Sequence, residues 1–250
     1  MENIKTKGLV LRQTNYSESD RILTIFTEEL GIVSAIVRGA RKYRSHQLGA
    51  AQILCFGTFN LYRGRSMYTV RGAVPLENFY AIGSEIEKLA LAMYLCDLTH
   101  TLVSDDNPDV EALRFLLNTL YILAYKERPL PVIKAVFELK IAEICGFGAQ
   151  CSCCVRCGTE NGLYWFSVDH GGLMCDGCIG GQRERVFCVH AALGKALRYI
   201  CEHDAERAYA FDLAKEELQV LSDLAEQFVL RQADRNFQCL QYYKSVMKRE

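Results

Sequence analysis

The first 80 residues carry apolar and polar side chains in short alternating runs, with the two-residue period of β-strands. Each run is rich in β-branched and aromatic residues and is bounded by turn-forming residues, which favours strands over helices. The pattern predicts five strands, over residues 8–12, 21–27, 31–38, 56–62 and 67–71. Five short strands with this spacing are typical of a small barrel.

Beyond residue 80 the apolar positions recur with a helical period. Residues 84–87 have the form of a capping box, which predicts a helix that continues to about residue 103. Asn107-Pro108 starts the next predicted helix, with the proline in its first turn, and Pro131 starts a third helix that ends at residue 146. Apolar stripes predict three more helices, over residues 191–201, 212–230 and 234–247.

Two C-x-x-C pairs interrupt the helical part, namely Cys154 with Cys157 and Cys175 with Cys178. Seventeen residues separate the pairs. This spacing is typical of a four-thiolate zinc site, because each pair forms a tight turn that presents two sulfurs to one tetrahedral ion. Between the pairs, the sequence predicts two short strands of a zinc ribbon. Four thiolates leave no open position for water or substrate, so the predicted zinc is structural rather than catalytic.

Other ligand sets are compatible with the same stretch. Cys151 and Cys154 also form a C-x-x-C pair, with Cys153 between them, so a shifted register is one alternative. Gly158 favours the unshifted register, because a residue without a Cβ lets the backbone turn tightly after the first pair. His170 in place of one sulfur is a second alternative. Unmetallated thiols, a redox pair and an iron–sulfur cluster are alternatives to zinc itself.

Together these patterns predict an α+β multidomain protein, with an N-terminal five-stranded OB-fold barrel and then an all-helical domain with an inserted four-cysteine zinc ribbon. Barrels of this kind commonly bind oligonucleotides across one face. The predicted divisions are the nucleic-acid-binding OB-fold, the first part of the helical domain, the zinc-binding insertion and the second part of the helical domain, over residues 1–80, 81–148, 149–183 and 184–250.

Charge is distributed unevenly along the chain. Residues 1–80 hold eleven Lys and Arg against six Asp and Glu, whereas the remaining residues hold eighteen against twenty-four. The basic excess suggests that the N-terminal part meets a polyanion, although a solvated basic face without a partner has the same pattern. The candidate DNA-binding residues lie at the end of the third predicted strand, after the third and fourth strands and on the fifth: Arg38, Arg41, Lys42, Arg44, Arg63, Arg65 and Arg71. Tyr43, Tyr62 and Tyr68 lie among them and offer ring faces for bases.

The sequence also argues against several classes of protein. No apolar run approaches the roughly 20 residues of a membrane helix, and the first residues do not resemble a secretory signal. We therefore expect a soluble cytoplasmic protein, in which clustered cysteines bind metal more often than they form disulfides. The sequence contains no phosphate-binding loop, dinucleotide fingerprint, zinc-protease motif or nucleophile elbow. These absences predict that the protein is not an enzyme.

Taken in order, the motifs resemble the RecO family of bacterial DNA-repair recombination mediators over essentially the whole chain. The motifs that carry the resemblance are residues 8–11, 18–27 with Gly31, 38–42 with Ser45, 154–158, 166–167 and 171–178. The resemblance implies an N-terminal OB-fold followed by a helical domain with a zinc-binding insertion. It also implies an ATP-independent activity, in which the protein binds single- and double-stranded DNA, anneals complementary strands and helps the recombinase replace single-stranded-DNA-binding protein.

The same resemblance implies RecR and the C-terminal tail of single-stranded-DNA-binding protein as partners. Two interpretations from other classes stand beside it: a protein–protein adaptor whose barrel is only structural, and an OB-fold RNA-binding protein with a structural zinc. A zinc hydrolase is a third, but it requires an open coordination position, which four sulfur ligands would exclude.

Overall fold

The computed structural model describes residues 3–41, 49–103, 107–180, 185–204 and 207–248. The chain forms two compact units, one of Met1–Tyr125 with Cys239–Glu250 and the other of Lys126–Gln238. In the described residues, no helix combines the length and the apolar character needed to cross a membrane. The domain divisions expected from the sequence stay a prediction.

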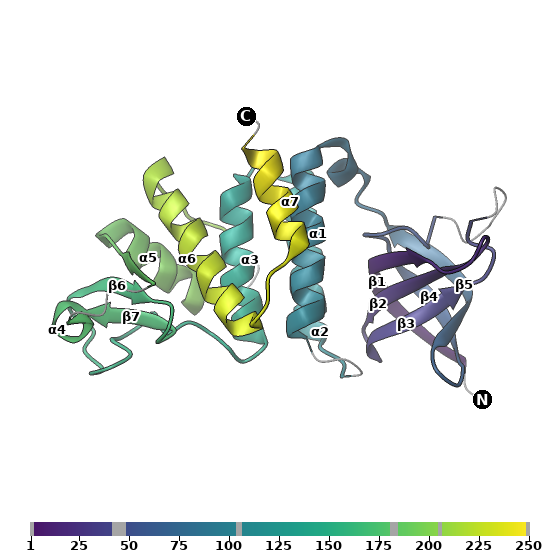
Figure 1. Cartoon of the computed structure of the whole chain (residues 1–250), viewed down its shortest axis with the longest axis horizontal. Helices are drawn as coiled ribbons and strands as arrows, with labels where there is room; N and C mark the ends of the chain where they lie inside the picture. Colours follow the sequence, from purple (N-terminus) through teal and green to yellow (C-terminus); the bar gives the residue numbers. More distant parts are fainter. Residues whose placement is uncertain (1–2, 42–48, 104–106, 181–184, 205–206, 249–250) are drawn as a thin grey trace. The chain divides into compact units, whose positions relative to one another are not determined.

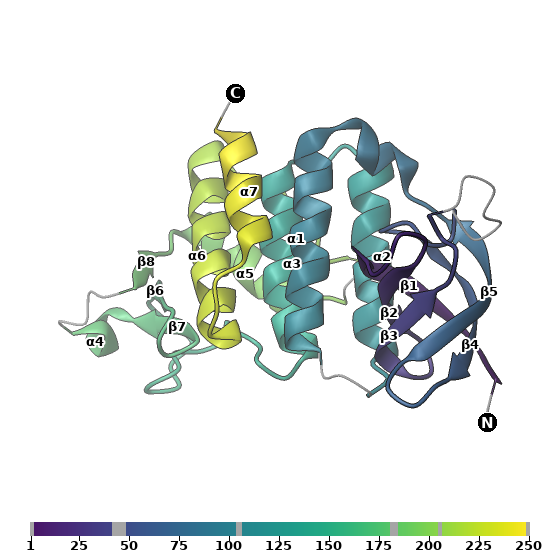
Figure 2. The same cartoon turned by 45° about the vertical axis from the view of Figure 1, so that its right-hand side comes forward.

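The first unit contains a closed barrel of five strands, as predicted (Figures 1 and 2). Its strands follow the barrel order β1-β2-β3-β5-β4, in which β3 and β5 are parallel and the other neighbours are antiparallel. Their bounds are β1 (Asn3–Asn15), β2 (Arg21–Thr27), β3 (Gly31–Val37), β4 (Phe56–Arg63) and β5 (Tyr68–Glu77). Inward-facing apolar side chains fill the barrel, including Leu23, Ile25, Phe59 and Leu61, each fully buried.

The first strand departs from strict alternation at one point. The pairing of β1 with β2 shifts register between Val10 and Arg12, so Leu11 is an extra residue in the ladder. Leu9, Val10 and Leu11 are consequently buried in succession. A bulge of this kind bends the strand and increases its twist, which helps a short sheet to close into a barrel.

The helices of the first unit begin later than the sequence predicts. After the 3-10 turn η1 (Tyr80–Ser84), helix α1 spans Ile86–Leu102, and the unit also holds α2 (Val110–Tyr125) and most of α7 (Gln238–Met247). The predicted capping box is wrong, because the Ser84 hydroxyl donates to the carbonyl oxygen of Ala81 and α1 has no side-chain cap.

The start of α2 also differs from the prediction. The Asp109 carboxylate accepts a hydrogen bond from the Ala112 N–H at 2.9 Å, so aspartate caps the helix. Pro108 therefore lies before the cap rather than inside the first turn. The prediction for Pro131 is confirmed, because α3 (Leu130–Ile144) has its proline in the first turn.

The second unit packs helices α3, α5 (Ala191–Glu202) and α6 (Lys215–Ala233) with a small three-stranded sheet. The sheet order is β7-β6-β8, formed by β6 (Leu163–Ser167), β7 (Gly172–Cys175) and β8 (Val186–Cys188), and the single turn α4 (Asp176–Ile179) follows β7. The first two strands were predicted, whereas β8 was not. Phe166 of the sheet meets Phe228 of α6 edge to face, with ring centroids 5.8 Å apart.

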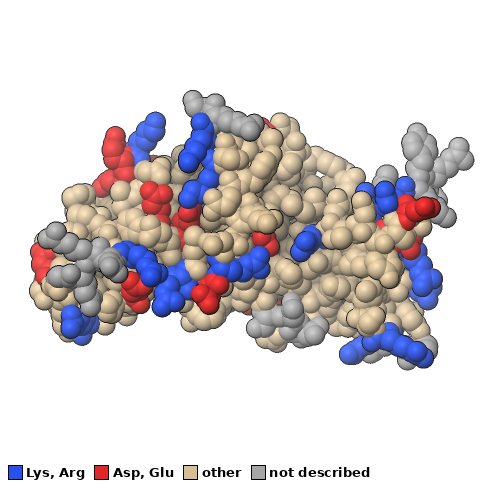
Figure 3. Space-filling view, in the orientation of Figure 1, with Lys and Arg blue, Asp and Glu red and all other residues tan. Residues whose placement is uncertain are grey.

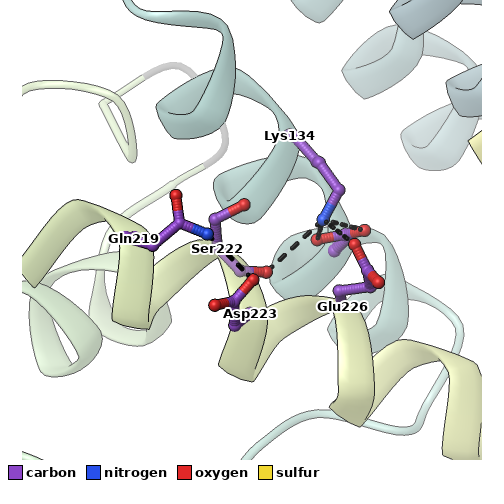
Figure 4. Close-up of polar contacts among 6 residues, drawn as sticks. Lys134, Gln219, Ser222, Asp223 and Glu226 are labelled. Atoms are coloured by element: carbon purple, nitrogen blue, oxygen red, sulfur yellow. Dashed lines mark hydrogen bonds and ion pairs between the residues drawn. The ribbon is translucent and has the colours of Figure 1, made fainter. Parts of the chain in front are cut away.

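A buried charge cluster joins α3 to α6 within this unit (Figure 4). The Lys134 ammonium lies 3.0 Å from a carboxylate oxygen of Glu138 and 3.0 Å from one of Glu226, and these side chains are 2%, 0% and 12% exposed, respectively. The ammonium is also 3.4 Å from the carbonyl oxygen of Ser222. Burial opposes the charge of Lys134, but the two carboxylates outweigh it and raise the pKa of the lysine. The cluster therefore links the two helices through buried groups of opposite charge.

Candidate nucleic-acid interface and metal centre

The basic turn that follows β3 is built on the carboxylate of Asp20. Its Oδ1 atom accepts hydrogen bonds from the Gly39 N–H at 2.8 Å and from the Ser19 hydroxyl at 2.9 Å. Gly39 has a φ of +67°, a left-handed conformation in which a glycine avoids Cβ strain. This turn leaves Arg38 and Arg41 exposed.

Arg41 is held in place by main-chain groups of the same neighbouring segment. Its N–H donates to the Ser19 carbonyl oxygen at 3.0 Å, and its guanidinium donates to the Ser17 carbonyl oxygen at 2.8 Å. A guanidinium has five N–H donors, so one such bond orients the group and leaves others for an anion. Lys42, Tyr43 and Arg44, which the sequence also suggests, lie outside the described residues.

Asp20 keeps its negative charge at the centre of this turn. The N–H of Gly39 is the main cause that lowers the pKa of the carboxyl, and the hydroxyl of Ser19 is the next. The charge of Arg38 acts in the same direction. Sequence reasoning assigned no role to Ser17, Ser19 or Asp20, although a short polar run directly before a strand is a sign of side chains that bond to a neighbouring backbone.

A second basic group lies where β4 turns into β5. Arg63 and Arg65 are exposed there, and the Arg71 guanidinium lies over the Tyr62 ring, 5.0 Å from its centroid. Tyr62 is half-buried, so its ring is part of the barrel surface and also makes a cation–π contact with the arginine.

Strand pairing relates the two basic groups to each other. Ala35 of β3 pairs with Tyr68 of β5, and Tyr68 pairs with Arg63 of β4. Arg38 comes three residues after Ala35, which is about 10 Å along the strand. The turn after β3 and the hairpin between β4 and β5 therefore both adjoin the neighbouring strands β3, β5 and β4. In the view of Figure 3, Lys and Arg side chains lie at several points around the barrel, at right.

The four predicted metal ligands come together in the second unit. The Sγ atoms of Cys154, Cys157, Cys175 and Cys178 all lie within 4.8 Å of one another. The Sγ atoms of Cys157 and Cys175 are 3.7 Å apart. A tetrahedral zinc ion with Zn–S bonds of about 2.3 Å separates its sulfurs by about 3.8 Å. The donor set and its spacing therefore fit a divalent zinc ion.

Local backbone structure creates this arrangement. Cys175 ends β7 and precedes α4, which carries Cys178. On the other side, the Gly158 N–H donates to the Cys154 carbonyl oxygen at 2.9 Å, and Gly158 has a φ of +75°. The glycine thus closes the first turn as the sequence suggests.

The electrostatics of the cluster match a site for a cation. Burial raises the pKa of Cys154, but N–H groups of Cys157, Cys175 and Arg156 outweigh this effect and lower it to about 6. Hydrogen bonds from Cys178 to Cys157 and Cys175 raise the pKa of Cys178 to about 12. One sulfur is therefore readily ionised while another retains its proton, and only a cation would favour four thiolates together.

The alternative ligands lie elsewhere in the described part of the chain. Cys151 is buried and forms a side-chain hydrogen bond with Cys201, and burial adds to this bond in raising the pKa of Cys151. The His170 ring nitrogen Nδ1 is 3.0 Å from the Ser167 hydroxyl. Neither residue belongs to the four-sulfur cluster.

Comparison with known proteins gives matches over both units. Residues 1–79 match the family model described as "Recombination protein O N terminal", and residues 83–240 match the model described as "Recombination protein O C terminal". The chain is 30% identical over 248 residues to "DNA repair protein RecO" of Acetivibrio thermocellus, which covers 98% of each chain. It is 31% identical over 245 residues to the protein of the same name from Alkaliphilus metalliredigens, covering 97% of this chain and 99% of the relative.

Proposed function

Because this chain belongs to the RecO family of DNA repair proteins, we propose that it is a DNA-binding recombination mediator. In this role it anneals complementary strands. It also helps a recombinase to load onto single-stranded DNA that is covered by single-stranded-DNA-binding protein. The activity needs no ATP and breaks no covalent bond, so the protein is not an enzyme.

The observation that carries the proposal is the pair of arginine groups on the barrel. Arg38 and Arg41 on one side and Arg63 and Arg65 on the other are exposed and border the same three strands. Exposed guanidiniums bind phosphates without the cost of desolvating a buried charge. Two separate groups could neutralise two strands that approach each other, which lowers the phosphate repulsion that opposes annealing.

The four-sulfur cluster supports a structural metal in this function. Cys154, Cys157, Cys175 and Cys178 would hold zinc, which supplies a cross-link between the loop after α3 and the end of β7. With four thiolates the coordination is complete, so no position remains for a reacting water. The metal would stabilise the small sheet and take no part in chemistry.

The proposal includes two protein partners, RecR and the C-terminal tail of single-stranded-DNA-binding protein. The net formal charge of the whole chain is −1, which is low for a protein that relies on DNA attraction alone. Contacts with a partner or with a protein-coated strand would therefore add to the affinity that the barrel provides.

The test is an annealing assay in which both complementary oligonucleotides are coated with single-stranded-DNA-binding protein. Fluorescence reports pairing, with and without this protein and without ATP. We expect faster annealing, and a weaker effect as the salt concentration rises. No acceleration from a folded, zinc-loaded sample would contradict the proposal and would favour a protein–protein adaptor. Competition between matched DNA and RNA oligomers separates the proposal from an RNA-binding function.

A further inference from the structure

A pocket of about 350 Å³ lies in the first unit, beside the β1–β2 end of the barrel and the segment that leads into α1. Its lining includes Gln13 and Arg21 from the strands, Leu54 from the loop before β4, and Asn78, Phe79 and Tyr80. This volume is at the lower end of the range for ligand pockets, which favours a small ligand or one group of a larger one.

The backbone is strained on two sides of this pocket. Leu54 has a φ of +63° and Phe79 a φ of +46°, a left-handed conformation that is costly for residues with a Cβ. In the described chain only two other non-glycine residues have a positive φ. Strain of this kind persists where the surrounding structure imposes it, and it concentrates at binding sites.

The same pocket contains unsatisfied polar atoms. Within the described residues, only two buried side-chain nitrogen or oxygen atoms have no hydrogen-bond partner: Nε of Arg21 and Oδ1 of Asn78. Both residues line the pocket. The Arg21 guanidinium is oriented by another of its nitrogens, which donates to Oε1 of Gln13 at 3.2 Å. A buried donor and a buried acceptor left unpaired are costly unless a ligand satisfies them.

The chemistry of the lining indicates which ligand fits. Its buried unpaired atoms are one donor and one acceptor, its apolar side includes Leu54, and Tyr80 at the pocket is 68% exposed. A nucleobase is planar, stacks on aromatic rings and carries a neighbouring acceptor and donor on its Watson–Crick edge. We propose that this pocket receives one unpaired base of single-stranded DNA, with its edge at Arg21 and Asn78 and its face on Tyr80. The inference rests on the proposed DNA-binding function and names a subsite for it.

A phosphate or a peptide carboxylate suits the pocket less well. Either group offers only acceptors, which Oδ1 of Asn78 would repel. The Glu77 carboxylate is also close, since its Oε1 atom accepts hydrogen bonds from the N–H groups of Asn78 and Phe79. An anion would gain from the Arg21 guanidinium, but it would leave Oδ1 of Asn78 without a donor and would meet the Glu77 charge beside the pocket, whereas a base can satisfy both unpaired atoms.

The proposed subsite has a consequence for annealing. A base whose Watson–Crick edge is bound cannot pair, so the pocket holds single strands and not duplex. Pairing with a complementary strand would withdraw the base and release the product. The arginine groups would then supply affinity for both forms, and the pocket would supply the preference for the unpaired strand.

The experiment compares two end-labelled oligonucleotides of equal length, oligo(dT) and its fully abasic counterpart, by fluorescence anisotropy at fixed salt. The two carry the same phosphates and differ only in their bases. We expect the wild-type protein to bind the base-bearing strand more tightly, by between about 5-fold and about 150-fold. Tyr80→Ala and Asn78→Ala should bring this ratio toward one and leave the affinity for the abasic strand and for duplex unchanged.

Two further variants separate base recognition from charge. Arg21→Lys keeps the positive charge but loses the planar fork, so it should lower the ratio without changing the salt dependence of binding. Gly83 lines the pocket and a Cβ there meets nothing within 4 Å, so Gly83→Phe should be accommodated, obstruct the pocket and lower the ratio while every polar group remains. Tyr242→Ala, at another exposed tyrosine of the same unit, is the matched control and should keep the wild-type ratio.

A measurement of stability tests whether Asn78 has only a structural role. Because Oδ1 of Asn78 has no partner, Asn78→Ala should leave the urea midpoint of unfolding unchanged or raise it, while the base preference falls. Equal, salt-dependent binding of both strands by the wild type would overturn the proposed base subsite and leave the proposed function standing. Pocket variants that keep the full base preference would have the same consequence. If Tyr80→Ala and Asn78→Ala kept the base preference but lost binding of a labelled peptide with the C-terminal tail of single-stranded-DNA-binding protein, the pocket would belong to a protein partner and the inference would be overturned. Binding of neither strand would overturn both proposals.

Discussion

In the unit that contains the barrel, arginines on a turn and on a hairpin lie exposed, whereas in the second unit Lys134 is buried between Glu138 and Glu226. The exposed groups retain their hydration, and an arriving phosphate can replace part of it at low cost. The buried lysine has lost its hydration, and its two carboxylates must compensate for that loss. We therefore expect groups with the same charge to differ in role because they differ in burial.

The four-sulfur cluster belongs with Lys134 in this comparison. It lies in the same unit as Lys134. Like the Lys134 cluster, it would bring opposite charges into close contact, here four thiolates around a cation. We expect charge in the second unit to determine stability and charge on the barrel to determine binding.

Removal of the metal should have the largest effect. A chelator should lower the thermal stability of the second unit by several kcal/mol, because metal binding and folding of such sites are coupled. Scanning calorimetry before and after chelation, with zinc added back, measures this change. Cys154→Ser should reproduce the loss. Cys153→Ser, next to the cluster but outside it, should not, and equal effects of the two variants would contradict the assignment.

The next largest effect should come from Lys134→Met. This change leaves the carboxylates of Glu138 and Glu226 buried without their cation, which should cost about 3–5 kcal/mol in urea unfolding. Lys195→Met, at an exposed lysine of α5, is the control and should change stability by less than about 0.5 kcal/mol. Replacement of all three cluster residues by apolar ones should recover most of the loss. A Lys134→Met protein as stable as the control would show that the cluster is not structural.

The pH dependence of the Lys134 contribution should be smaller and confined to alkaline solution. The carboxylates raise the pKa of Lys134 in the folded state, despite its burial. A group with a raised folded pKa contributes fully below its unfolded pKa, about 10.4 for lysine, and loses that contribution as the pH rises through the folded value. The difference in unfolding free energy between wild type and Lys134→Met should therefore stay constant from about pH 8 to 10 and fall above that range. A fall already between about pH 8 and 9 would contradict the direction of the shift.

Arginine substitutions on the barrel should have the smallest effect on stability. Arg63→Gln or Arg65→Gln should change the free energy of unfolding by less than about 0.5 kcal/mol, because both side chains are exposed. The same variants should bind single-stranded DNA more weakly, with equal losses for different base sequences. If these substitutions unfolded the barrel or left DNA binding intact, charge would not have the different roles that we expect in the two units.

The sequence predicted those features that depend on local pattern. Alternation within each strand determined the five-stranded barrel, and the spacing of two C-x-x-C pairs identified the four sulfurs that meet. Both signals are contained in short stretches of chain. The exposed arginines were recognised from their local sequence as well.

Features that depend on tertiary neighbours were not predicted. Lys134 and Glu226 are 92 positions apart, and only the packing of α3 on α6 brings them together. The capping box at Ser84 failed because a 3-10 turn ends at this residue and uses its hydroxyl. The unpaired atoms of Arg21 and Asn78 likewise come from segments that meet only after the barrel has formed.

The salt dependence of single-stranded DNA binding tests most directly whether the barrel arginines hold DNA. For contact with about four phosphates, the wild-type protein should give a slope of log affinity against log salt of about −3. A variant with Arg38, Arg41, Arg63 and Arg65 changed to Gln should give a much shallower slope and keep the wild-type urea midpoint. An unchanged slope in that variant would contradict the account, because the phosphates would then be bound elsewhere.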